Sequence, residues 1–394
     1  MFKSFAFKIY VVALILRLIP VIAARSLGIG LDDMFQYDML ARSLAQGHGF
    51  RWYAESDLNQ LASFVDFDLS TAREYDPSLG VATSFRAPLY PAFLAIVYFF
   101  NGIDFSRFFA ARLAQAIFLG APLAPLTYLV AQRLFTFNFP APIKIESGKL
   151  IERTARLSAW VIAAYPLLLV YPLGLGTENP FFVLLLASFL FFLSSTERPS
   201  TSHFLLSGIF LALTALTRSV ILAFALAAFC LLFYLRGKRA IASILAFVLV
   251  VAPWTIRNSL LHGELTGIET SMGYNLYLGY HPEGNGSFFF GPSLDLLPIL
   301  DDAERDKIGT EKAIEFIKAQ PERFVPLAIN RLGFFFGLEK RVLMYFYGND
   351  LLGFIPLPLL LTISAILLLP FVIISISAAL GLSLLRWNPQ TCLL

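Results

Sequence analysis

Two adjacent carboxylates, Asp32 and Asp33, follow directly after the first long apolar run of the sequence. Paired carboxylates immediately outside an apolar helix can bind a cation or serve as a general base. The same pair also suits the start of a helix, where an Asp caps free backbone N–H groups and meets a favourable helix dipole. Spacing alone leaves both interpretations open.

Three arginines lie at the ends of other apolar runs. Arg86 precedes a short apolar stretch, where its guanidinium can grip a phosphate through two parallel hydrogen bonds or simply anchor the chain at a membrane surface. Arg218 stands between two apolar segments, a position where ionisable residues are usually functional or paired. Arg257, next to Asn258 and close to Trp254, is a third candidate for binding phosphate or sugar.

Two further candidates come from short polar segments. Glu178 lies in a tight turn, residues 176–180, where it could supply a second carboxylate or belong to a set of residues that starts a helix. Residues 271–279 are rich in Tyr, Asn and Gly and predict a loop. Tyr274 and Asn275 of this loop could contact a sugar ring, or the loop could be an ordinary surface turn.

Several reaction types lack their sequence signatures. There is no glycine-rich Lys-Ser/Thr phosphate loop and no His-Glu-x-x-His motif, which disfavours nucleotide-driven and zinc-dependent chemistry. No metal ligands are predicted, although the carboxylate pair is compatible with a divalent cation. The two cysteines, Cys230 and Cys392, support neither a disulfide framework nor a prenylation motif. The four histidines lack ligand spacing and are predicted to be polar loop residues: His48, His203, His262 and His281.

The composition identifies the environment in which these residues must work. The 394-residue chain is 57% hydrophobic and only 14% charged, whereas soluble domains carry about 25% charged residues. Its net charge of +3 is too small to indicate a nucleic-acid partner. We therefore expect an all-α integral membrane protein, with the first apolar run kept as an anchor rather than removed as a signal.

Apolar runs of about 20 residues predict membrane-spanning helices. The runs are residues 8–27, 108–134, 155–175, 180–195, 204–235, 240–254 and 354–385, of which 204–235 is long enough for two helices meeting at Arg218. Residues 88–100 are too short to cross and predict an interfacial helix.

Charge predicts which loops face outward. Short basic loops around residues 3–8, 133–156, 198 and 236–239 should be cytoplasmic, which requires residues 88–100 to stay outside. Seven spans within residues 1–258 then enclose a first outer loop at 28–107, a second outer loop occupies 259–350, and one span lies in 351–394. The two large outer loops and the short turn holding Glu178 contain 24 of the 27 acidic residues. Amphipathic helices are predicted in the outer loops at 35–45 and 301–320.

Five segments occur in an order that resembles bacterial GT-C glycosyltransferases of the dolichyl-phosphate-mannose–protein mannosyltransferase superfamily, which includes the lipid A aminoarabinose transferase. They are LDDMFQYDMLARSLAQGHGF, RAPLYPAFLAIVYF, TENPFFVLLLASFLF, LALTALTRS and PWTIRNSLLHGELTGIETSMGYNLYLG. Together they extend over roughly two thirds of the chain, between residues 32 and 279. Each segment is a weak pattern, whereas the ordered set is fairly specific.

The resemblance implies a GT-C-type multi-span helical bundle with juxtamembrane helices in a large first outer loop. It also implies that Asp32 or Asp33 activates the acceptor and that Arg86 contacts the donor phosphate. Further polar positions near the same cavity have matches in the family: Glu178, Arg218 and Arg257. Relatives usually continue through several more spans than this chain has, which leaves the acceptor open.

The leading hypothesis is a glycosyltransferase that moves a sugar from a polyprenyl-phosphate donor to a glycan, lipid or protein acceptor. Its site would face the periplasm from the inner membrane. The rival is a lipid-linked-sugar flippase or small-solute transporter, but such proteins usually place ionisable groups near the bilayer midplane and contain related halves. A catalytically inactive scaffold of the same fold is the third alternative.

Overall fold

The computed structural model describes residues 4–138, 144–197, 199–337, 347 and 353–384. The described chain is nearly all-α, as its composition predicts. It forms two compact units, each assembled from segments that are distant in sequence. Unit 1 comprises Met1–Gly28, Phe105–Val251 and Glu339–Leu394, and unit 2 comprises Ile29–Asp104 and Ala252–Leu338.

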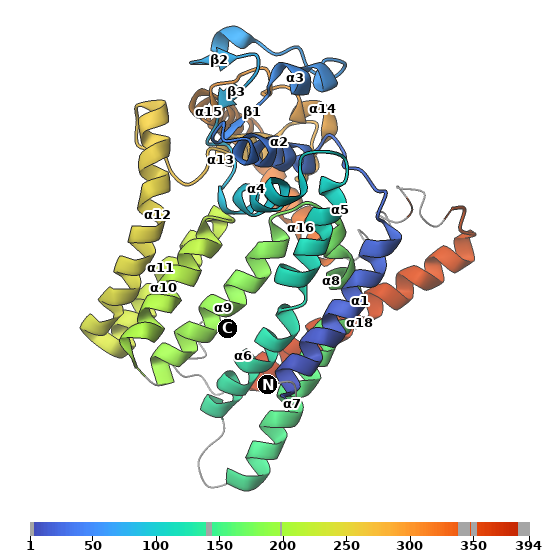
Figure 1. The fold of residues 1–394 in the computed structure, drawn as a ribbon, viewed down its shortest axis with the longest axis vertical. Coiled ribbons are helices and arrows are strands. Elements are labelled where there is room, and N and C mark those ends of the chain that lie inside the picture. The colour runs from blue at the N-terminus through green and yellow to red at the C-terminus, as the bar shows by residue number, and fades with distance from the viewer. Residues whose placement is uncertain (1–3, 139–143, 198, 338–346, 348–352, 385–394) are drawn as a thin grey trace. The chain divides into compact units, whose positions relative to one another are not determined.

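Unit 1 is a helical bundle, in which α9 packs against α10 and α6, and α6 packs against α7 (Figure 1). Its helices and helical turns are α1 (Phe5–Ala23), α5 (Arg107–Ala114), the π-helix η2 (Gln115–Gly120), α6 (Leu123–Asn138), α7 (Lys144–Ala164), α8 (Pro166–Val170), η4 (Tyr171–Leu173), α9 (Glu178–Glu197), α10 (Thr201–Ala215), η5 (Ser219–Ile221), α11 (Leu222–Arg236), η6 (Gly237–Ala240), the first half of α12 (Ile241–His262) and α18 (Leu357–Leu384).

Five helical segments of the described chain are long and apolar enough to cross a membrane. They are Phe5–Ala23, Arg107–Leu134, Glu178–Glu197, Ser219–His262 and Leu357–Ser383, and the bent pair Gly148–Ala164 and Pro166–Leu173 makes a sixth if counted as one span. These helices indicate a multi-pass membrane protein.

The eight predicted spans are not all matched by helices of spanning length. The 15-residue α10 is about 22 Å long at 1.5 Å per residue, short of a hydrocarbon core of about 30 Å. The segment Ser219–His262 folds back on itself at η6, because the rings of Phe229 and Phe247 from its two legs lie 5.3 Å apart. The two antiparallel helices α11 and α12 therefore agree with the break predicted at residues 236–239.

A buried arginine holds the bend between α7 and α8. Pro166 has no N–H, so the carbonyl of Ile162, four residues earlier, loses its usual helical partner. The fully buried Arg17 of α1 donates to that carbonyl at 3.2 Å and to the carbonyl of Ala163 at 3.2 Å. Gly120 makes room for this side chain, since a Cβ there would lie 2.8 Å from Arg17 Cδ.

Replacing Arg17 by Met is expected to lower the thermal stability of the protein. The substitution keeps an unbranched apolar side chain but leaves the carbonyls of Ile162 and Ala163 without donors, at a cost of about 2–3 kcal/mol. The measurement is the thermal midpoint in detergent by fluorescence-detected gel filtration. The control is Arg25→Met at an exposed position, and an unchanged midpoint for Arg17→Met would contradict this account of the bend.

Unit 2 combines helices with a small antiparallel sheet in the order β1-β3-β2, which the sequence did not predict. Its elements are α2 (Asp33–Ala45), β1 (Arg51–Trp52), α3 (Glu55–Leu61), η1 (Leu69–Thr71), β2 (Tyr75–Asp76), β3 (Gly80–Ala82), α4 (Leu89–Asn101), the second half of α12, α13 (Met272–Tyr280), α14 (Phe290–Ser293), α15 (Asp302–Ala319), η7 (Pro321–Arg323) and α16 (Phe324–Phe336).

The core of unit 2 joins the sheet to α2 through buried aromatic and aliphatic side chains, among them Phe35, Leu40, Trp52 and Phe85. The face predicted for residues 35–45 is thus the buried face of α2. The short apolar stretch predicted at 88–100 is α4, which packs against α2; its place at a membrane surface stays a prediction.

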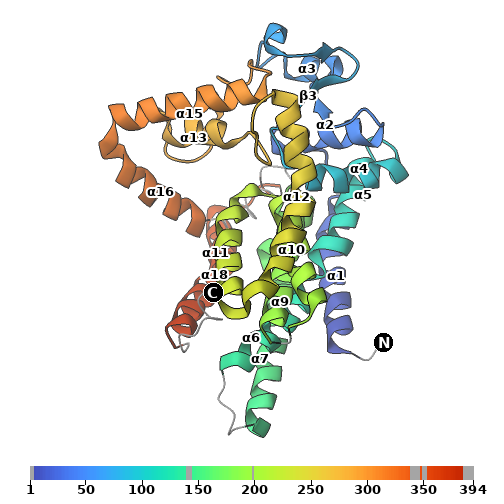
Figure 2. The same cartoon turned by 90° about the vertical axis from the view of Figure 1, so that its left-hand side faces the viewer.

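Two glycines let α13 and α15 pack closely together in unit 2 (Figure 2). A Cβ on Gly273 would lie 1.8 Å from the Asp306 carbonyl oxygen, and a Cβ on Gly309 would lie 2.6 Å from the Gly273 backbone. The Gly273 N–H donates to the Asp306 carboxylate at 2.5 Å. This contact explains why residues 271–279, predicted as a loop, form the helix α13.

Candidate functional site

The two adjacent carboxylates occupy different positions at the start of α2. Asp32 is the N-cap residue, and its carboxylate accepts a hydrogen bond of 2.8 Å from the Met34 N–H. Asp33 is the first helical residue, and its carboxylate pairs with Arg86. Both acidic residues are exposed, so the helix-capping interpretation holds for Asp32 without hiding its carboxylate from a ligand.

The surroundings of Asp32 raise the pKa of its carboxyl above the ordinary value. Although part of its surface is exposed, nearby chain removes enough water to raise the pKa of the Asp32 carboxyl. The Met34 hydrogen bond lowers that pKa, while the charge of Asp33 raises it further. The net direction is upward, which favours proton acceptance at this position.

Arg86 is held rigidly at the same end of α2. Its Nε donates to Gln36 Oε1 at 2.8 Å, its Nη2 pairs with Asp33, and only 15% of its side chain is exposed. The guanidinium also lies over the rings of Tyr37 and Phe85, at 5.2 and 5.1 Å. A guanidinium fixed in this way presents a preorganised positive charge next to the two carboxylates.

The α2 helix that carries these groups is itself anchored by buried polar contacts. The fully buried Asp38 carboxylate accepts from Arg42 Nε at 2.8 Å and from the Tyr98 hydroxyl of α4 at 3.0 Å. Arg42 also pairs with Asp57 of α3 at 2.7 Å. These contacts fix the direction of α2 and thereby the position of its N-terminal carboxylates.

Tyr274 and Asn275 lie on helix α13, which corrects the prediction of a loop for this segment. The Tyr274 ring packs on Phe85 at 5.5 Å, and its hydroxyl donates to the Ser293 carbonyl at 2.9 Å. Burial raises the pKa of Tyr274 to about 12, although the positive charge of Arg86 lowers it. Asn275 is exposed and donates to the Ser271 carbonyl. The Tyr274 ring therefore packs against Phe85, the residue next to Arg86, and its hydroxyl is already hydrogen-bonded.

The Arg257 side chain makes its contacts within the protein. Its Nη1 donates to the Thr83 carbonyl at 2.5 Å and to Asn258 Oδ1 at 3.0 Å, and its guanidinium lies 4.9 Å from the Trp254 ring. These bonds tie α12 to the segment that leads into Arg86. These contacts engage the Arg257 guanidinium within the chain, and its predicted contact with phosphate or sugar stays a prediction.

A buried ion pair fixes the segment before Arg86. Asp302 and Arg305 of α15 form a salt bridge, and both side chains are at most 1% exposed. The other Asp302 oxygen accepts from the Thr83 hydroxyl at 2.5 Å and from the Ser84 N–H at 2.7 Å. The Arg305 guanidinium lies 4.5 Å from the Phe85 ring. Asp302 and Arg305 are neighbours on one helix, but Thr83 and Ser84 lie more than 200 positions earlier, so local sequence patterns do not reveal these contacts.

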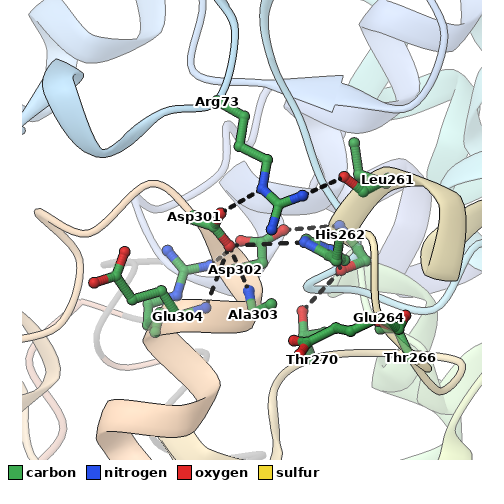
Figure 3. Close-up of polar contacts among 12 residues, drawn as sticks. Arg73, Leu261, His262, Glu264, Thr266, Thr270, Asp301, Asp302, Ala303 and Glu304 are labelled. Carbon is green, nitrogen blue, oxygen red and sulfur yellow. Dashed lines mark hydrogen bonds and ion pairs between the residues drawn. The ribbon is translucent and has the colours of Figure 1, made fainter.

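His262 belongs to the same buried network, which corrects its prediction as a polar loop residue. It ends α12, and its Nε2 lies 2.6 Å from the hydroxyl oxygen of Ser84. Its Nδ1 lies 3.7 Å from the Asp301 carboxylate, which also accepts from Arg73 at 2.7 Å (Figure 3). The pKa of Asp301 is well below its usual range because of the contact with His262, and the Arg73 hydrogen bond adds to the effect.

Glu178 and Arg218 meet in unit 1, although the sequence did not predict them as a pair. Arg218 Nη1 lies 2.7 Å from the Glu178 carboxylate and 3.4 Å from the Thr177 hydroxyl. Arg218 lies in the break between α10 and α11, as expected, and Glu178 begins α9. Both side chains stay partly exposed, at 42% and 35%.

The sequence did not predict one acidic neighbour of Arg86, the residue Glu269. Glu269 acts electrostatically on Arg86, and it lies in the segment Gly267–Thr270 between α12 and α13. No motif distinguishes this Glu from other loop acids, so only the fold reveals it. Across the described ranges, no three His, Cys, Asp or Glu side chains gather in a way that would hold a metal ion.

The fold and this site define a nearly all-α, multi-pass membrane protein with carboxylates and an arginine gathered at one helix N-terminus. Comparison of the chain with protein-family models, with curated proteins and with solved structures finds no match.

Proposed function

We propose that this protein is a membrane glycosyltransferase that takes a sugar from a polyprenyl-phosphate donor. The observation that carries the proposal is the combination of an exposed carboxylate, Asp32, with a fixed arginine, Arg86, at one helix N-terminus. A membrane-embedded helical body suits a donor with a long hydrocarbon chain. The segment resemblance described above supports the same reaction and the periplasmic side.

In the proposed reaction Asp32 takes the proton from an acceptor hydroxyl. The acceptor oxygen then forms a bond to the anomeric carbon while the bond from that carbon to the phosphate oxygen breaks. The polyprenyl phosphate leaves with the electron pair, and Arg86 stabilises the charge that develops on it. A single displacement inverts the anomeric carbon. Asp33 pairs with Arg86 and holds its guanidinium in place.

Substituting Arg86 tests the assigned phosphate contact. Arg86→Gln is expected to reduce kcat/KM for a polyprenyl-phosphate sugar about 100-fold or more, because a preorganised donor of positive charge is lost. The measurement is transfer of radiolabelled sugar by purified protein in liposomes, with membrane extract as acceptor. The exposed Arg153→Gln serves as the control. Equal kcat/KM values for the two variants would rule out Arg86 as the phosphate ligand.

The pH dependence of transfer follows from the raised pKa of Asp32. A base must be deprotonated, so transfer falls as pH drops through a value above the usual Asp pKa of about 3.9. In Asp33→Asn a neighbouring negative charge disappears, and the acidic limb of the profile is expected to move to lower pH. The measurement is kcat/KM against pH for wild type and variant. A limb that moves upward would contradict the assignment of Asp32 as the base.

The flippase and transporter alternatives predict movement of the lipid-linked sugar without a new glycosidic bond. The buried arginines of unit 1 give these alternatives little support: Arg17 and Arg112 both donate to backbone carbonyls of the bundle. The transfer measurement decides between these classes. The inactive-scaffold alternative predicts neither transfer of the sugar nor movement of the lipid-linked sugar.

A further inference from the structure

The helix α16 has one face bound to the chain and one face fully apolar. On the bound face, Arg331 Nη2 donates to the Gly279 carbonyl at 2.7 Å, and Arg323 Nη2 donates to the Gly284 carbonyl at 2.7 Å. Asn330 donates to the Asn285 carbonyl at 3.2 Å. Leu327, on the same side, is only 4% exposed. These contacts fix the rotation of α16 about its axis.

The opposite face presents large apolar side chains to the surroundings. Val325, Ile329 and Leu332 follow the spacing of one helical face and are 62%, 62% and 59% exposed. Phe335 lies beside them and is 63% exposed. All the charged and amide side chains of α16 have their contacts on the bound face, so this stripe contains no polar side chain.

A lipid surface fits this face better than water does. Each Å² of apolar surface removed from water contributes about 25 cal/mol, so contact between these exposed side chains and lipid is favoured over contact with water. The helix has 13 residues, and at 1.5 Å per residue it is about 20 Å long, too short to cross a hydrocarbon core of about 30 Å. A helix with an apolar stripe on one side and its polar side chains on the other typically lies in the plane of the membrane interface.

The position of α16 in the chain agrees with a place at the membrane. It ends at Phe336, and the apolar α18 of spanning length begins at Leu357. Residues 337–356 connect the two helices and can extend to about 70 Å at about 3.5 Å per residue, so the chain allows α16 to lie at the bilayer that holds α18. In Figure 2 α16 turns away from the end of α15 at an angle to it.

We propose that α16 is an interfacial helix whose stripe Val325, Ile329 and Leu332 is inserted into the lipid surface. Inserted in this way, α16 would anchor unit 2 to the bilayer, while the spanning helices anchor unit 1. The proposal concerns this surface alone and does not depend on the sugar-transfer reaction.

Site-directed spin labelling of the full chain tests the proposal. Cys230 and Cys392 are first replaced by Ser, and a nitroxide is then attached at Ile329→Cys or Leu332→Cys. The protein is reconstituted in palmitoyl-oleoyl-phosphatidylcholine vesicles, and collision rates with oxygen and with a water-soluble nickel chelate are measured. The matched control is Glu315→Cys, an exposed charged position on α15.

At positions 329 and 332 the expected result is a high collision rate with oxygen and a several-fold lower rate with nickel, whereas position 315 shows the reverse. High nickel accessibility at 329 overturns the proposal, because the stripe then faces water. Low rates with both reagents and spin–spin broadening in the fully labelled sample overturn it in favour of a second copy of this chain. Low rates with both and no broadening overturn it in favour of cover by another part of the same chain.

Discussion

Asp32→Asn is expected to lower kcat for sugar transfer about 100- to 10,000-fold while the protein stays folded, since that is the usual contribution of a general base. Asn removes the basic oxygen but caps a helix about as well as Asp does. The cap bond to the Met34 N–H, 2.8 Å long in the wild type, therefore survives the substitution. The measurement is single-turnover transfer together with the thermal midpoint.

Asp33→Asn is the matched comparison for this prediction. It removes the carboxylate of the next residue. The Asp33 side chain is 67% exposed, and its carboxylate pairs with Arg86. Transfer should fall less than in Asp32→Asn, because Arg86 keeps its bond to Gln36. A larger loss in Asp33→Asn, with both variants folded, would transfer the role of base to Asp33.

Asp302→Asn should cause the largest loss of stability in unit 2. Arg305 is fully buried, and without the negative charge of Asp302 its guanidinium would lie uncompensated among Phe85 and Trp52. Leaving one partner of a buried pair unneutralised costs about 3–5 kcal/mol. The measurement is the free energy of unfolding, or the shift of the thermal midpoint, in detergent.

Glu304→Gln is the control for Asp302→Asn. Glu304 lies in the same first turn of α15 but is exposed, so its loss should cost less than about 1 kcal/mol through the helix dipole. A thermal midpoint for Asp302→Asn equal to that of Glu304→Gln would show that the Asp302–Arg305 pair does not hold the segment before Arg86. Asp302→Asn should also lower transfer, because the Thr83 and Ser84 contacts that lead to Arg86 weaken.

The helices of this protein follow from local patterns in the sequence. The apolar face of residues 35–45 and the capping residue Asp32 predict α2, and the pattern around Asp301 and Pro321 predicts α15. Hydropathy likewise identifies the long apolar helices. The turn at Gly237, where φ is +57°, falls in the basic loop predicted between the runs 204–235 and 240–254. The number of spans is harder to predict, because the apolar α10 has only 15 residues.

The candidate site depends on contacts that local patterns do not contain. Arg86 meets Asp33 across 53 positions, and Ser84 meets His262 across 178 positions. The sequence therefore indicated individual charged residues as candidates but did not predict these contacts between them. The error at residues 271–279 has a tertiary cause: the contact of Gly273 with Gly309 overrides a composition typical of turns.

The measurement that tests the central proposal most directly follows one donor in sealed proteoliposomes. A polyprenyl-phosphate sugar carrying a radiolabel in the sugar is supplied with membrane extract as acceptor, and the label is traced into acceptor and across the bilayer. We predict a new alkali-stable glycosidic product with inverted anomeric configuration, formed by wild type and absent in Asp32→Asn. Label that crosses the bilayer while still attached to the polyprenyl phosphate, without any such product, would contradict the transferase proposal and favour a flippase.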